Sequence, residues 1–363
     1  MNAPENLSTE ETSRTTRENR LAEIRHEAKE HGQVPCDSAR LSERDQLSKA
    51  GHIGYYDTPV LKRPQWTIEV PIYFFVGGVA GASAVIAAVS ELSSADARLV
   101  RQSRWLAAIG GLVSPALLIS DLGVPSRFLN MLRVFKIQSP MSVGSWTLVA
   151  FSNSAVAAAV LGEFNKRRRS RLVDVLTDGA QIVSALTGLI LATYTGVLIG
   201  ATAIPAWNEH VSTLPIHFAA SGTAGAVAIL ELVGNESEAL NRIAIGAAAV
   251  ETAMGASIEL SRTPASESLK SGISGWAMRG AGVLSGPVPL LLRLLALKSR
   301  RSRISLRKAA AISSIAGSLL TRWAWIHAGR VSADDPSVPL QLRGRVSSSR
   351  DELLDHRDQK GPR

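Results

Sequence analysis

The sequence is poor in cysteine and in aromatic residues. Of its 363 residues only Cys36 is a cysteine, and Phe, Trp and Tyr together make up 5%. One cysteine cannot form an intrachain disulfide, hold a cysteine-ligated iron–sulfur cluster or attach a c-type haem. Any redox centre must therefore come from a partner or bind without a covalent link, and we expect no metal in this chain.

Charge is also scarce, and it is confined to short islands and the two tails. Charged residues make up 20% of the chain and hydrophobic residues 45%, a distribution typical of membrane proteins. Segments of about 20 residues, the length that crosses roughly 30 Å of hydrocarbon as a helix, occur eight times. They are approximately Val70 to Leu92, Trp105 to Leu122, Val143 to Phe164, Gly179 to Ala203, Thr213 to Val233, Ala239 to Leu260, Gly280 to Leu297 and Leu306 to Ala328. The sequence predicts an all-α polytopic membrane fold with about eight transmembrane helices.

Small residues recur at three- and four-residue spacing in these spans, for example in "GGVAGASAVIAAVS" and "IAIGAAAVETAMGAS". In lipid, small residues let helix backbones approach closely, so we expect tight helix packing. Two spans also contain proline well inside the segment, in "VSPAL" and "SGPVPLLLR". Both are candidate helix breaks.

Basic residues are concentrated in alternate loops. Fifteen Lys and Arg follow the first, third, fifth and seventh spans, whereas six lie in the other three loops. By the positive-inside rule the first set of loops faces the cytoplasm. Both termini are therefore predicted to lie on the outer side of the inner (cytoplasmic) membrane. The island "NKRRRSR" is interpreted as an orientation anchor and not as a nucleic-acid site, because it has no aromatics to stack bases.

The two ends of the chain, residues 1–53 and 337–363, are polar and flank a membrane domain over residues 54–336. The first has no apolar core, so it is neither a secretory signal nor a transmembrane segment. Its stretch "TTRENRLAEIRHEAKEHG" either forms a surface helix against a partner or stays disordered.

Ionisable side chains inside the spans are the best pointers to function, because each costs at least about 2.5 kcal/mol at mid-membrane unless it is paired or hydrated. Glu251 lies near mid-membrane, where proton handling is the natural functional interpretation. Arg322 either pairs with Glu259 or extends towards the surface. Other polar groups gather towards the predicted outer face, namely Glu69, Tyr73, Asp121, Trp146, Tyr194 and His217, while Glu91, Glu163 and Glu231 mark the inner ends.

The stretch "SDLGVPSRFLNMLRVFKIQSPMSVGSW" is the most specific element of the sequence. Together with "GYYDTPVLKRPQWTIEVPIYFFVGGVAGASA", "TYTGVLIGATAIPAWN" and "LLTRWAWIHAGRVSADDP" it resembles the NrfD family, over approximately Gly54 to Pro336. These are the integral-membrane subunits of polysulfide reductase-like molybdoenzyme complexes. The resemblance implies two four-helix bundles, no redox metal, and a site for menaquinone or ubiquinone beside an iron–sulfur subunit that serves a molybdopterin subunit.

The resemblance also implies that the quinone site lies at the outer ends of the first four helices. The residues of this chain that fall there are Glu69, Tyr73, Asp121, Arg127, Trp146 and Tyr194. We expect Asp121 to accept a proton from quinol, and Tyr194 and Arg127 to donate to the head group. Trp146 would pack on the ring or the isoprenoid tail. Glu251 and His217 are added from their depth in the membrane and not from the resemblance.

The predicted function is therefore a quinone-reactive, membrane-anchoring subunit of a respiratory oxidoreductase, with proton translocation left open. Two other functions stay open at this point. A secondary transporter or proton-conducting protein also places ionisable groups near mid-membrane. A cytochrome b would use facing histidines such as His217 and His327.

Overall fold

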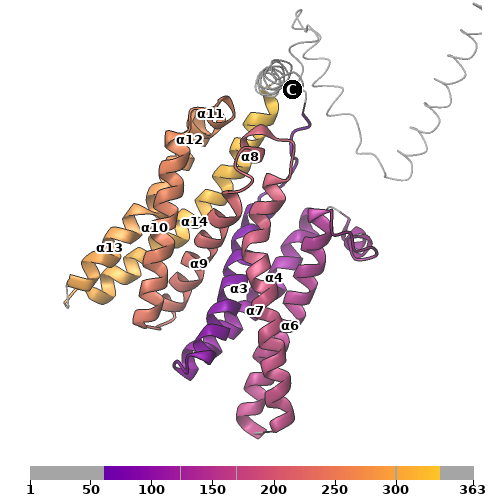
Figure 1. Cartoon of the computed structure of the whole chain (residues 1–363), viewed down its shortest axis with the longest axis vertical. Coiled ribbons are helices and arrows are strands. Elements are labelled where there is room, and N and C mark those ends of the chain that lie inside the picture. The colour runs from indigo at the N-terminus through magenta and orange to yellow at the C-terminus, as the bar shows by residue number, and fades with distance from the viewer. Residues whose placement is uncertain (1–60, 123, 169, 299–300, 336–363) are drawn as a thin grey trace, which may run out of the picture. The chain divides into compact units, whose positions relative to one another are not determined.

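The computed structural model describes residues 61–122, 124–168, 170–298 and 301–335. All regular elements in these ranges are helical (Figure 1), so the predicted all-α fold is confirmed for the part that the structure describes. The polar tails predicted at 1–53 and 337–363, including the segment that could form a surface helix, lie outside the described residues.

Eight long elements follow one another along the chain, one of them in two pieces. The long helices are α3 (Glu69–Leu92), α4 (Ala97–Asp121), α6 (Pro140–Arg168), α7 (Arg171–Gly200), α9 (Leu214–Leu232), α10 (Glu238–Leu260), α12 (Gly272–Ser285) with α13 (Pro287–Lys298), and α14 (Arg303–Asp334). Short turns connect them: η2 (Pro125–Arg127), α5 (Phe128–Met131), α8 (Pro205–Asn208) and α11 (Pro264–Lys270). Several helices extend beyond the predicted spans, because helical structure continues past the apolar core.

Seven of these elements, counted within the described residues, are long and apolar enough to cross a membrane. The chain is thus a multi-pass membrane protein. The predicted eighth span falls in α14, which is less apolar. At 32 residues α14 is about 48 Å long, and its crossing of the membrane stays a prediction.

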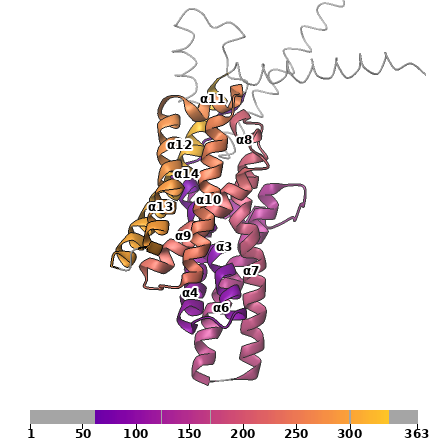
Figure 2. The same cartoon turned by 60° about the vertical axis from the view of Figure 1, so that its left-hand side comes forward.

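Helix α3 lies at the centre of the packing. It contacts α4 and α7 on one side and α9 and α14 on the other, and α6 completes the first side against α4 and α7 (Figures 1 and 2). Helices α10, α12 and α13 pack around α9 and α14. Glycines make the closest of these contacts: a Cβ on Gly222 of α9 would lie 2.9 Å from the backbone of Gly78 in α3, and a Cβ on Gly81 would collide with the backbone of Gly188 in α7. The expected packing through small residues is therefore confirmed.

Of the two helix breaks predicted from interior prolines, one occurs and the other does not. The break predicted at "SGPVPLLLR" is confirmed: α12 ends at Ser285 and α13 starts at Pro287, with Gly286 between them at φ −103° and ψ −94°. The break predicted at "VSPAL" is wrong, because α4 runs without interruption through Pro115. A hydroxyl from α6 replaces the hydrogen bond that this proline cannot make: Ser152 Oγ donates to the carbonyl oxygen of Gly111, four residues before it, at 2.6 Å.

Candidate functional site

The predicted outer-face residues divide between two small groups in the first helices. Asp121, at the end of α4, accepts hydrogen bonds from the backbone N–H (3.0 Å) and the hydroxyl of Thr67. It thereby holds the segment that leads into α3. Glu69, the first residue of α3, has one buried carboxylate oxygen with no hydrogen-bond partner. Such an oxygen is available to a ligand or a proton.

The two predicted tyrosines form the second group. Tyr73 of α3 and Tyr194 of α7 are 2% and 6% exposed, so both phenols are buried. The ring of Tyr194 lies directly over Gly144, where a Cβ would overlap it. The glycine of the "SPMSVGSW" element is thus explained by the space that this phenol needs.

Two other predicted residues lie nearer the surface. Trp146 is 40% exposed on α6 and meets the ring of Phe135 edge to face at 6.2 Å. Arg127 ends the short helix η2 and is exposed. Arg127 lies in the connection between α4 and α6 and Trp146 in the second turn of α6, and the predicted roles of both stay predictions.

The two residues chosen from their depth come together in the interior. His217 Nε2 of α9 lies 3.3 Å from Glu251 Oε2 of α10, and Ser285 Oγ, at the end of α12, donates to the same oxygen at 2.6 Å. Glu251 is 1% exposed and His217 5% exposed. The second carboxylate oxygen, Oε1, is buried without a hydrogen-bond partner among the residues that the structure describes. One oxygen is therefore fixed while the other is free to accept a proton or a ligand.

Arg322 of α14 adds a positive charge close to this pair. Neither position expected for Arg322 is correct: it does not pair with Glu259, and it is fully buried. Its guanidinium donates to the hydroxyl groups of Ser221 and Ser318 and to the carbonyl oxygen of Phe218 (3.1 Å). It interacts with Glu251 through space. Rotating α14 by about half a turn would carry this side chain to the lipid at the same depth, so depth alone could not indicate its partners.

A cavity of about 480 Å³ opens beside the Glu251–His217 pair. It lies among α9, α10, α12, α13 and α14, and most of its surface is apolar. Arg279 and Glu259, which form an exposed ion pair at 2.9 Å, line it nearer the predicted outer face. An apolar cavity with a few converging polar groups has the character of a small-molecule site.

The inner carboxylates are occupied by ion pairs. Glu231 of α9 binds the fully buried Arg293 through both oxygens, at 2.7 and 3.0 Å, and Arg307 Nε lies 3.4 Å away. Glu91 pairs with Arg104 (2.6 Å) and Glu163 with Arg101 (2.9 Å). Sequence reasoning missed Arg293, although an arginine inside "PVPLLLRLLAL" is itself a signal that a buried partner is needed.

The remaining histidines near the predicted outer face have other partners. His327 Nδ1 lies 2.9 Å from Ser274 Oγ, and its ring stacks on Trp323 with the centroids 5.0 Å apart. His210 precedes α9 and meets the ring of Trp325 at 5.3 Å. Burial holds the pKa of His210 below its ordinary value, so the neutral ring is favoured. Both His217 and His327 are thus engaged with side chains of this chain.

Comparison with known families gives one match. A family model for the NrfD type of polysulfide reductase matches residues 53–334, which include all the helices described above. No curated protein matches the chain.

Proposed function

Because the chain belongs to the NrfD-type polysulfide reductase family, which indicates a membrane subunit of a redox complex, we propose that it is the quinone-reactive, membrane-anchoring subunit of a multisubunit oxidoreductase. It passes electrons between the quinone pool and an iron–sulfur partner, which in turn serves a molybdopterin catalytic subunit. The observation that carries the proposal is the buried Glu251–His217 pair on the wall of an apolar cavity.

The pair provides what quinol chemistry requires from the protein. Oxidation of a quinol, menaquinol or ubiquinol, releases two electrons and two protons. The electrons leave to the partner's cluster. Glu251 Oε1 accepts the proton of one quinol hydroxyl, and the proton of the hydroxyl at the opposite end of the ring leaves along the side of the cavity lined by Glu259. His217, in contact with the other carboxylate oxygen, is the next proton carrier, and Arg322 stabilises the negative charge that returns when the proton leaves.

The cavity also suits the substrate's shape. An aromatic ring enters an apolar space of about 480 Å³ among the helices, while its polar head meets the few polar groups at Glu251. The isoprenoid tail then remains in contact with lipid. The outer-end group with Asp121, Glu69 and Tyr194 is the second place for the head group, as the family resemblance implies, and the experiment below separates the two.

Protons released from the quinol are proposed to leave the protein only at the predicted outer face of the membrane. Glu231 would be the nearest inner carrier, but it is held by Arg293 through both oxygens and is not free to exchange protons. Protons from Glu251 therefore leave towards the predicted outer face, along the side of the cavity lined by Glu259 and Arg279.

The partner is proposed to bind at the same face. Helix α5 and the loop that follows it expose large apolar side chains, with Leu129 68%, Phe135 56% and Ile137 78% exposed. Arg133 and Lys136 lie among them. A mixed apolar and basic surface of this kind fits a soluble protein subunit with an acidic rim.

The test measures binding of a short-chain quinol analogue to the purified protein in detergent. Quenching of tryptophan fluorescence reports the binding. Trp325 is a built-in reporter, because its ring lies 6.2 Å from that of His217. We expect Glu251→Gln to weaken binding at least tenfold, since a hydrogen bond to a charged group contributes about 1.5–3 kcal/mol. Glu259→Gln, the same change in an exposed residue of the same cavity, should alter binding less than twofold.

Other outcomes would contradict parts of the proposal. If Asp121→Asn or Tyr194→Phe removes binding while Glu251→Gln does not, the quinone site lies at the outer ends of the first helices. If the wild-type protein binds neither quinol nor quinone, the quinone-reactive function itself is wrong.

One observation favours a second candidate, a proton-conducting or transport protein. The helix break at Gly286 lies beside Glu251, and transporters place broken helices at mid-membrane sites. Proteoliposomes loaded with a pH-sensitive dye separate the two functions. Proton flux in the absence of quinone and redox partner, lost in Glu251→Gln, would support the transporter.

A further inference from the structure

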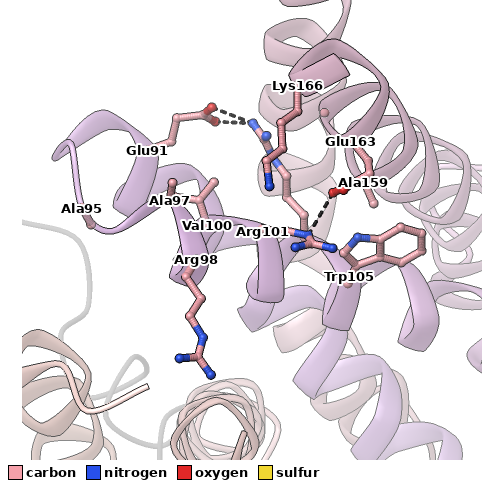
Figure 3. Close-up of a pocket in the computed structure, with 12 residues that line it drawn as sticks. Glu91, Ala95, Ala97, Arg98, Val100, Arg101, Trp105, Ala159, Glu163 and Lys166 are labelled. Carbon is pink, nitrogen blue, oxygen red and sulfur yellow. Dashed lines mark hydrogen bonds and ion pairs between the residues drawn. The ribbon is translucent and has the colours of Figure 1, made fainter. Parts of the chain in front are cut away.

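Two cavities meet near the first turns of α4, at the end of the bundle opposite Asp121. The first, of about 530 Å³, lies among the ends of α3, α4 and α6. Four basic side chains and two acidic ones line it: Arg98, Arg101, Arg104, Lys166, Glu91 and Glu163 (Figure 3). The second, of about 480 Å³, lies between α4 and α9. Both are lined by Arg98, Arg101 and Trp105, so they adjoin each other along α4.

The first cavity carries an excess of positive charge. Its two carboxylates are each taken by one arginine, Glu91 by Arg104 and Glu163 by Arg101. Lys166 has no hydrogen-bond or ion-pair partner in the described ranges, and Figure 3 shows it pointing into the space between these two pairs. Arg98 reaches only a backbone carbonyl oxygen, that of Val233, at 3.3 Å. Two cations therefore remain available to an anion.

The second cavity is apolar and extends deeper along the helices. Its walls are Trp105, Leu106 and Ile109 of α4 and Ile229, Leu230 and Val233 of α9. Arg98 lies near the start of α4, and Ile109 follows it by about 16 Å along the helix axis. Trp105, 38% exposed, lies between them at the depth where tryptophan favours the membrane–water interface.

We propose that the two cavities together bind one anionic phospholipid. Its phosphate contacts Arg98, which lines both cavities, and an acyl chain lies between α4 and α9. Figure 3 shows Arg98 pointing away from Lys166, so Lys166 attracts the head group through its charge from the first cavity. The match is one of charge and of geometry: a cationic pocket at the membrane surface opens into an apolar groove that runs into the hydrocarbon. Helices α4 and α9 touch each other far less than each touches α3, so the lipid fills a seam between the two sides of the molecule.

The test uses delipidated protein in detergent, titrated with phosphatidylglycerol and followed by native mass spectrometry and by the melting temperature. Phosphatidylcholine with the same acyl chains and inorganic phosphate are the comparison ligands. Each basic residue near a membrane surface contributes a free energy that corresponds to about fivefold in affinity. We expect Lys166→Gln to weaken phosphatidylglycerol binding about fivefold and Arg98→Gln/Lys166→Gln about 25-fold. Lys298→Gln, an exposed lysine at the end of α13, should leave binding unchanged.

A second variant tests the groove without removing charge. Ile109→Trp fills the space between α4 and α9 and should remove the lipid adduct while the basic pocket stays intact. Equal binding of phosphatidylcholine, or unchanged binding in either Arg98→Gln/Lys166→Gln or Ile109→Trp, would overturn the proposal. If inorganic phosphate raises the melting temperature as much as phosphatidylglycerol does at equal concentration, the pocket is a free-anion site and the lipid is the wrong ligand.

Discussion

Arg293 provides the sharpest test of how this fold tolerates charge in its interior. Its fully buried guanidinium makes two hydrogen bonds to Glu231, at 2.7 and 3.0 Å, and one to Asn241, at 3.1 Å. Arg293→Leu would leave a 5%-exposed carboxylate with Arg307 Nε, 3.4 Å away, as its remaining cation. Removing one partner of a buried ion pair costs about 3–5 kcal/mol when the other charge is left uncompensated, and because Arg307 remains near Glu231 the loss should fall at the lower end of this range. We expect a loss of that size in the free energy of unfolding.

The assay is denaturant unfolding in detergent micelles, followed by tryptophan fluorescence. Arg279→Leu is the matched control, since Arg279 and Glu259 pair at 2.9 Å with side chains that are 47% and 52% exposed. An exposed pair contributes about 0–1 kcal/mol. Glu231→Gln/Arg293→Leu should recover part of the stability, because the buried negative charge is gone. Equal losses in Arg293→Leu and Arg279→Leu would refute the reasoning.

Two further predictions concern the first helices and the turn before α9. Gly144→Ala should lower the free energy of unfolding by about 1–3 kcal/mol, because the new Cβ overlaps the buried ring of Tyr194. Gly179→Ala is its control, since a Cβ there meets no atom within 4 Å, and the same unfolding assay should find it neutral or slightly stabilising. An equal loss in both would show that Tyr194 does not need the glycine. Burial lowers the pKa of His210 in the folded protein, so below pH about 6.5 the unfolded chain binds the proton more readily. Stability should therefore be complete above this pH and fall as the pH decreases through it, and His210→Gln should reduce the slope of melting temperature against pH between 7 and 5.5. A melting temperature that rises towards acidic pH, with the slope unchanged in His210→Gln, would contradict this assignment.

Hydropathy predicted where the helices lie better than where they end. The predicted second span begins at Trp105, whereas α4 begins at Ala97. The predicted span leaves three charged residues in the loop before it, namely Arg98, Arg101 and Arg104. All three belong to the first eight residues of α4. A helix continues past the hydrocarbon as long as its side chains find water, lipid head groups or ion pairs, and hydropathy alone does not record these partners.

The candidate site was predictable in part. A carboxylate near mid-membrane needs a partner or a function, and this argument singled out Glu251, which is buried beside His217. Its contacts were not predictable, because they depend on how each helix is rotated about its axis. Ser285 is an ordinary residue in the sequence and reaches Glu251 only because α12 ends beside α10. Arg322 faces the interior and bonds Ser221 and Ser318, so the partner expected from its neighbouring depth, Glu259, was wrong.

The prolines also show that contacts between distant helices could not be predicted from the local sequence. Pro115 and Pro287 both remove a backbone donor, and in lipid the carbonyl oxygen left behind must find another partner. For Pro115 that partner is Ser152, 41 positions from the carbonyl of Gly111 that it satisfies, and the helix continues. After Ser285, a glycine and two closely spaced prolines meet at one point, and the helix ends and restarts. Local sequence thus sets the cost of a break, and at Pro115 a distant hydroxyl offsets that cost. The break at Gly286 leaves Ser285 at a helix end, where its hydroxyl reaches the carboxylate on which the proposed chemistry depends.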